Sequence, residues 1–138
     1  MKNNKGFSLV ELIIVIAIMA ILVGVMAPQL IKYIEKTNVS ADVQVCDSVR
    51  TALTTACLDP DVVKNGGTIA DTDANITSIT NKDVKAAAEE ILGMGLGDVQ
   101  GKMKSKNAKG KAVNYKKSGS QIMVYSSGDK TIYSGYVK

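Results

Sequence analysis

Residues 7–27 read FSLVELIIVIAIMAILVGVMA, and this stretch decides the fold. Its only polar side chains are those of Ser8 and Glu11. At 1.5 Å per residue, a helix of this length spans about 32 Å, enough to cross a hydrocarbon core of about 30 Å. Lys2 and Lys5 precede it, which favours an amino terminus that stays in the cytoplasm. The sequence therefore predicts one membrane-spanning or anchoring helix at the start of the chain.

The composition of the whole chain argues against catalysis. The 138 residues contain no His and no Trp, and only two Cys. His-based triads and His metal sites are therefore excluded, and two thiolates cannot close a zinc site by themselves. Only about 110 residues follow the apolar segment, which limits the size of any soluble core. We expect no enzyme, no cofactor and no metal.

The formal net charge of +4 is unevenly distributed along the chain. The stretch from Glu35 to Asp98 contains eleven acidic and five basic residues, whereas the stretch from Val99 to Gly128 contains seven Lys and no acidic residue. These lysines are Lys102, Lys104, Lys106, Lys109, Lys111, Lys116 and Lys117. Three hypotheses follow: a solvated surface that protects a sheet edge, a contact with the acidic 35–98 segment of another subunit, and, as the weakest, binding to DNA phosphates.

The helix is predicted to continue well beyond the apolar segment. Small and apolar side chains recur at helical spacing along one face, and Asp59-Pro60 ends the pattern because proline disfavours helix in the residue before it. The members of this predicted face are Ile34, Ala41, Val45, Val49, Ala52 and Ala56. We predict one helix over 7–58, apolar all round in its first half and amphipathic in its second.

Residues 59–138 are predicted to form a globular head. Residues 59–80 read as a loop with at most one short strand, and residues 81–92 as a short helix ended by Gly93. Three strands follow within 112–137, at Ala112–Lys116, Gln121–Ser126 and Thr131–Val137, separated by Ser-Gly turns. The predicted fold class is therefore α+β, with the second half of a long helix packed on a small antiparallel sheet.

One loop in the head begins like a calcium-binding loop. Asp71, Asp73 and Asn75 have the spacing of the first ligands in an EF-hand. Ile76 replaces the required Gly, and Lys82 replaces the closing Glu. A charged, solvated loop is the better interpretation.

The helical turn between Gly24 and Pro28 is predicted to be the least stable part of the long helix. Proline removes one backbone donor, so the carbonyl of Gly24 loses its partner, and glycine is a poor helix former. The hypotheses are a mere bend, as tolerated in membrane helices, and local melting of the helix.

The function of the apolar segment has three interpretations at this level. A cleaved secretory signal would be cut after Ala27, although Pro28 hinders that cut and Glu11 fits an apolar middle poorly. A plain single-span anchor is the second interpretation. The third depends on the residues KGFSLVEL at 5–12.

Residues 5–12 closely resemble the processing site of type IV prepilins. In that family a short basic leader ends in Gly, a membrane aspartyl peptidase cuts after it, and the same enzyme methylates the new amino terminus. The resemblance implies a leader at 1–6, cleavage between Gly6 and Phe7, N-methylation of Phe7, and an assembly role for Glu11. It covers about the first 35 residues, includes Pro28, and implies that 7–28 is a transmembrane segment that becomes filament core. The short leader and Phe7 resemble those of type IVa prepilins. In assembled filaments of the family, the helix is commonly unwound near the positions of Gly24 and Pro28.

The presence of Glu11 in an apolar helix also needs a physical explanation, apart from this resemblance. A carboxylate deep in a bilayer helix costs on the order of 2.5–3.5 kcal/mol and is expected to have a partner. Cleavage after Gly6 would create a positive amine on Phe7, which could pair with Glu11 of its own chain or of a neighbouring subunit. The alternative is an acid in the first helical turn, favoured by the helix dipole and reaching the interface.

The resemblance implies a structural subunit of a type IV pilus, a surface filament for adhesion, twitching motility or DNA uptake. Its expected partners are copies of itself in a helical filament, the prepilin peptidase, the ATP-driven assembly machinery and the membrane. The precursor would be single-pass with its amino terminus inside, and the assembled pilus extracellular. The alternatives are a pseudopilin of a type II secretion or competence machine and, from a different class, a singly anchored surface binding module.

The two cysteines are predicted to be free thiols. Cys46 and Cys57 are eleven residues apart, which is roughly 16 Å along a helix, whereas a disulfide needs Cα atoms within about 7 Å. The opposing interpretation is an intramolecular bridge, which requires the helix to end before about Thr54.

Overall fold

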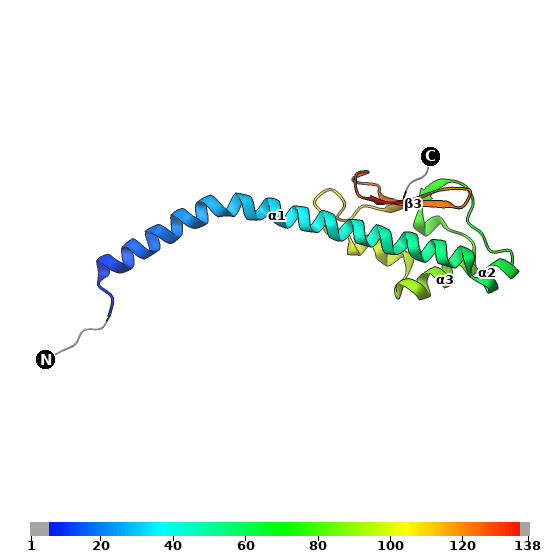
Figure 1. The fold of residues 1–138 in the computed structure, drawn as a ribbon, viewed down its shortest axis with the longest axis horizontal. Coiled ribbons are helices and arrows are strands. Elements are labelled where there is room, and N and C mark those ends of the chain that lie inside the picture. The colour runs from blue at the N-terminus through cyan, green and yellow to red at the C-terminus, as the bar shows by residue number, and fades with distance from the viewer. Residues whose placement is uncertain (1–5, 136–138) are drawn as a thin grey trace. The chain divides into compact units, whose positions relative to one another are not determined.

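The computed structural model describes residues 6–135, and the chain forms two compact units, Met1–Glu35 and Lys36–Lys138. Most of the predicted leader, residues 1–5, lies outside the described residues, as does the end of the last predicted strand at 136–138. Figure 1 shows α1 and the elements of the second unit.

The long helix α1 runs from Leu9 to Leu58. It therefore begins two residues later than the predicted start at Phe7. It is helical throughout, including Gly24 and Pro28. It ends before Asp59, whose side chain accepts the N–H of Asp61 and caps the short helix α2, Pro60–Lys64. Proline is well tolerated at the first position of a helix, so the Asp-Pro pair both ends α1 and begins α2.

The sheet of the second unit has four antiparallel strands, in the order β1-β2-β3-β4. These strands are Asp73–Asn75, Val113–Ser118, Gln121–Ser126 and Tyr133–Ser134. The sheet therefore has one strand more than the three predicted within 112–137: β1 pairs with β2 at the edge and lies in residues 59–80, where the sequence allowed one short strand. Residues 73–75 read DAN, which is poor strand sequence, and only pairing with a distant strand makes this segment extended.

The hairpin between β2 and β3 is closed by a two-residue loop. Ser118 pairs with Gln121, which leaves Gly119 and Ser120 as the loop. Gly119 has φ 60°, and no residue other than glycine has a positive φ among the described residues. Positive φ at the first loop position alone is the pattern of a type II′ turn, which requires glycine there. The sequence thus fixes the register of the two longest strands.

Three further helical segments complete the second unit: η1 (Ile76–Ser78), α3 (Lys82–Leu92) and η2 (Leu96–Lys102). Asn81 caps α3 by accepting the N–H groups of Asp83 and Val84, and Gly93 ends it in the left-handed conformation at φ 72°. Asparagine is a preferred amino-terminal cap and glycine a preferred carboxyl-terminal one. The predicted helix over 81–92 is therefore α3, with residue 81 as its cap.

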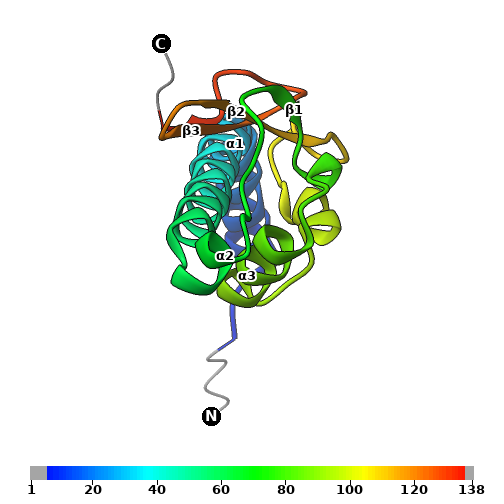
Figure 2. The same ribbon diagram turned by 90° about the vertical axis from the view of Figure 1, so that its right-hand side faces the viewer.

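The core lies between the second half of α1, the sheet and the helical segments, as Figures 1 and 2 show for the second unit. Fully buried side chains include Leu53 on α1, Ile76 on η1, Val124 on β3 and Ile132 before β4. Burial of such side chains is the main favourable term in folding.

The buried face of α1 differs from the predicted one. Its buried residues are Asp42, Cys46, Val49, Ala52, Leu53 and Ala56. Ala41 and Val45 are only half-buried, and Ile34 is 52% exposed. The predicted face was therefore rotated, because a pattern of apolar residues assigns Asp42 to solvent although this carboxylate is bound by the protein backbone.

Candidate functional site

The start of α1 is fixed by a reciprocal pair of hydrogen bonds between Ser8 and Glu11. Glu11 donates its N–H to Ser8 Oγ at 3.3 Å, and Ser8 donates its N–H to Glu11 Oε2 at 3.0 Å. Leu12 donates its N–H to the carbonyl of Ser8 at 3.1 Å, so that the helix begins directly after Ser8. This is a capping box, in which Ser and Glu three residues apart satisfy helix-end donors. The S-x-x-E spacing signals it in the sequence, but the sequence reasoning considered Glu11 without Ser8.

Gly6 and Phe7, the predicted cleavage and methylation site, precede the helix. Neither residue is helical, and Phe7 is 86% exposed. A Cβ placed on Gly6 would have nothing within 4 Å. The peptide bond between them is therefore open to solvent and lies directly before the capping box.

The apolar segment that follows is exposed along its length. Large apolar side chains from Leu9 to Met26 are 48–73% exposed. Within the described residues, α1 is the one helix long and apolar enough to cross a membrane. A monomer in water rarely shows such a surface, so this segment is built to be covered by lipid or by protein.

Gly24 and Pro28 lie within this exposed part of α1. A side chain at Gly24 would meet nothing within 4 Å. The glycine is therefore not required there for close packing within the chain. The structure brings neither residue into contact with Ser8 or Glu11, which are more than twelve residues away along the helix.

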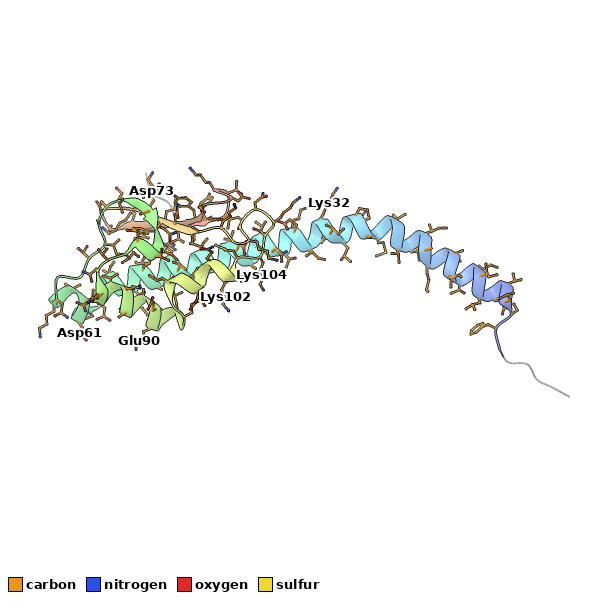
Figure 3. All side chains as sticks on the ribbon, turned by 180° about the vertical axis from the view of Figure 1, so that it is seen from behind. Lys32, Asp61, Asp73, Glu90, Lys102 and Lys104 are labelled. Atoms are coloured by element: carbon orange, nitrogen blue, oxygen red, sulfur yellow. The ribbon has the colours of Figure 1, made fainter. Side chains whose placement is uncertain are left out.

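The lysine-rich segment presents its charges outward from an ordered backbone. Exposed Lys102, Lys104 and Lys106 alternate with buried Met103 and Ser105. Figure 3 shows Lys102 and Lys104 close together beside α1, with Asp61 and Glu90 nearer the end where α2 and α3 lie. Of the seven lysines, Lys117 is partly buried and pairs with Asp71, with Nζ 2.6 Å from Oδ1.

Asp42 anchors this segment to α1, and sequence reasoning missed it. Its carboxylate is fully buried and accepts the backbone N–H of Lys104 at 2.7 Å and of Ser105 at 2.8 Å. A buried carboxylate is tolerated only when hydrogen bonds replace its lost hydration. Asp42 is therefore a structural clamp between α1 and the loop that follows η2.

The segment that begins like a calcium loop is engaged in sheet contacts. Asp71 also accepts the N–H of Gly119 at 3.0 Å, and Asp73 accepts the hydroxyl of Tyr125. The bond from Lys117 is the main cause that lowers the pKa of Asp71. Among residues 6–135, no three His, Cys, Asp or Glu side chains gather as a metal site. The acids of this loop therefore tie the hairpin to the preceding segment.

Both cysteines are free thiols, as predicted. Cys46 is fully buried in the core, and its thiol lies 3.9 Å from the carbonyl oxygen of Ile132. Burial, with the nearby Asp42, raises the pKa of the Cys46 thiol to about 12. Cys57 is half-buried on the same helix, and its pKa is also raised by burial.

The fold and this amino-terminal segment define a class: an α+β protein with an exposed, capped, apolar helix at its start and a small antiparallel sheet packed on the rest of that helix. Comparison with known proteins then gives the family that the chain resembles. Residues 1–27 match the family model for the prokaryotic N-terminal methylation motif. The chain is similar to a fimbrial protein of Pseudomonas aeruginosa, with 37% identity over 76 residues, 55% of this chain and 49% of that protein. It is also similar to a type IV major fimbrial protein FimA of Dichelobacter nodosus, with 44% identity over 56 residues, 41% of this chain and 36% of that protein.

These matches confirm the resemblance to type IV pilins that residues 5–12 indicated, and they are to structural proteins rather than enzymes. The matched stretches span half or less of the length of these relatives. No solved structure matches the chain significantly.

Proposed function

We propose that this chain is the structural subunit of a type IV pilus. The observation that carries the proposal is the methylation motif at 1–27, located at the start of a long helix whose apolar side chains are exposed. The precursor would cross the cytoplasmic membrane once, with its amino terminus inside because Lys2 and Lys5 precede the apolar segment. After assembly the protein would form an extracellular helical filament with a core of helices from many copies.

Processing would take place at the junction before the capping box. A prepilin peptidase would cut between Gly6 and Phe7 and methylate the new amine of Phe7. Subunits would then be added by the pilus assembly machinery, with residues 7–28 moving from lipid into the filament core. The loss of backbone pairing at Pro28, together with Gly24, would allow the helix to bend or unwind there during packing.

Glu11 would direct assembly by pairing with the amine of Phe7. The capping box supports this role because it folds the Glu11 carboxylate back to the N–H of Ser8, the residue next to that amine. The other oxygen of the Glu11 carboxylate would pair with the amine of its own chain or of a neighbouring subunit. Pairing across subunits would remove two charges from an apolar core only when the copies add in register.

The decisive experiment is electron microscopy of the producing cells, combined with the intact mass of protein sheared from their surface. We expect filaments that disappear when the gene is deleted, and a mature chain that begins at methylated Phe7. A chain that begins at Met1 or Pro28 would contradict the processing step, and the absence of filaments would contradict the pilus.

A pseudopilin of a type II secretion or competence machine is the alternative within the family, since it would carry the same amino-terminal motif. The same microscopy separates the two, because a pseudopilin predicts loss of secretion or DNA uptake on deletion without long surface filaments. The lysine-rich segment favours a third candidate, a singly anchored surface binding module. That candidate predicts unassembled protein on the cell surface and salt-sensitive binding to an anionic partner, with DNA as one such partner.

A further inference from the structure

The first residue of α1 is set by Ser8 rather than by the start of the apolar segment. Phe7 is as apolar as the residues that follow it, yet the helix begins at Leu9. Both bonds of the capping box and the first backbone bond of the helix involve Ser8. Because serine is a preferred amino-terminal cap and phenylalanine is not, the position of Ser8 decides where the helix begins.

We propose that Ser8 is a positioning residue for cleavage of the Gly6–Phe7 bond, an inference that rests on the proposed processing. By ending the helix after the scissile bond, the Ser8 cap keeps that bond in non-helical backbone. Proteolysis is concentrated in non-helical, exposed segments, because a helical bond must first be unwound. Hydrolysis adds one water across the bond and leaves a carboxylate on Gly6 and an amine on Phe7.

The sequence contains a competing cap on the other side of the bond. Asn4 is also a preferred cap residue, and a helix that begins after it would start at Lys5 and enclose the Gly6–Phe7 bond. Gly6 disfavours that longer helix but does not forbid it. For Ser8→Ala we therefore expect an equilibrium between the short helix, with the bond outside, and a longer one, with the bond inside.

This equilibrium gives the two halves of the capping box different roles. The Ser8 hydroxyl accepts a backbone N–H, so it fixes the helix start whether or not Glu11 carries a charge. The Glu11 carboxylate accepts the N–H of Ser8, a bond that a glutamine side chain can also form in a capping box. Helix start and charge can therefore be changed separately.

The test uses the full-length precursor in membrane vesicles with the prepilin peptidase, and it measures kcat/KM for cleavage. Ser8→Ala removes the cap and adds a strong helix former, so we expect a decrease of up to about fivefold, the factor by which the loss of a typical cap changes the equilibrium between the two helices. Ser8→Thr retains a capping hydroxyl and should be cleaved at nearly the wild-type rate. Glu11→Gln retains the box and should also be cleaved normally.

A second substitution distinguishes a helix effect from recognition of the Ser8 side chain. Asn4→Ala alone should leave cleavage unchanged, whereas Ser8→Ala with Asn4→Ala should recover most of the lost rate, because the longer helix loses its own cap. The amide of Leu9, which is the first residue of α1 and has a backbone acceptor within the helix only if the helix starts earlier, should become protected from hydrogen exchange in Ser8→Ala and not in the double variant. Wild-type cleavage of Ser8→Ala, slow cleavage of Ser8→Thr, or the absence of recovery in the double variant would each overturn the inference.

The test also separates this inference from the proposed function. A wild-type precursor that the peptidase does not cleave contradicts the proposed processing. In that case the exchange of the Leu9 amide in Ser8→Ala still decides whether Ser8 sets the helix start.

Discussion

The Glu11 carboxylate binds the backbone of the first helical turn and is also the proposed partner of the Phe7 amine. Its Oε2 atom satisfies the N–H of Ser8, which lowers the cost of placing an acid at the end of an apolar helix. The sequence analysis weighed pairing with an amine against a first-turn acid favoured by the helix dipole. The structure has the first-turn geometry, and that geometry is compatible with later pairing.

We predict that Glu11→Ala leaves membrane insertion intact and strongly reduces incorporation into filaments. The apolar segment loses its only charge, so insertion becomes easier, but the proposed partner of the Phe7 amine is lost. The measurement is filament yield from cells that produce the variant as their sole subunit, with membrane fractionation as the control for insertion. Normal filament yield would contradict the pairing, and Glu11→Gln, which retains the capping box, should assemble as poorly as Glu11→Ala.

Asp42 is the residue whose loss should destabilise the globular unit most directly. Asp42→Ala leaves the N–H groups of Lys104 and Ser105 buried without an acceptor, so we expect the free energy of unfolding to fall by about 3 kcal/mol. Denaturant unfolding of the whole protein in detergent micelles would measure the change. The matched control is Glu90→Ala, an exposed acid on α3, which should change stability by less than about 0.5 kcal/mol. Equal stabilities of the two variants would show that Asp42 is not a clamp.

The cysteines should differ in reactivity between the folded and unfolded protein. Burial raises the pKa of Cys46 to about 12, so at pH 8 its thiol is neutral as well as inaccessible. We expect an alkylating reagent at pH 8 to leave Cys46 unlabelled in the folded protein, and to label both cysteines after unreduced denaturation. Mass spectrometry counts the labels. No label after denaturation would mean a bridge, and with it a helix shorter than α1.

At the scale of elements, local sequence signals set most of the boundaries. Asp59-Pro60 separates α1 from α2, Asn81 begins α3, and Gly93 ends it. The last strand is an exception, since β4 has only two described residues although a longer strand was expected. Its attachment to α1 depends on side chains: Arg50 Nε donates to Ser134 Oγ at 3.1 Å, and Ser134 Oγ donates to Asp47 at 2.8 Å.

The β2–β3 turn gives a prediction at this scale. Gly119→Ala forces a Cβ into positive φ, and a Cβ there would meet no atom within 4 Å, so the cost is backbone strain of about 1–2 kcal/mol. Gly101→Ala is the matched control, because that glycine also has open space around it but lies in η2 without a positive φ. Thermal unfolding should show a lower midpoint for Gly119→Ala and little change or an increase for Gly101→Ala. A similar decrease for both variants would exclude turn strain as the cause.

At the scale of the whole molecule, the two units differ in whether their own chain covers their apolar side chains. Residues 7–27 expose apolar side chains that only lipid or other subunits can cover, whereas residues 36–135 bury a core of their own. In the proposed filament, association would cover the apolar side chains of the first unit and leave the second unit folded on its own contacts. This division supports the proposed function, in which the protein is stored in a membrane and then polymerised.

The sequence by itself determined the apolar segment, the N-terminal methylation motif, the carboxyl end of α1 and the caps and turns that delimit the elements. These features depend on neighbours within a few residues, through helical periodicity, capping spacing and the φ preferences of glycine and proline. Only the tertiary structure decided that Asp42 is buried, since its partners are Lys104 and Ser105, 62 and 63 residues further along the chain. The same holds for β1, which is extended because β2 supplies backbone partners that its own sequence does not predict.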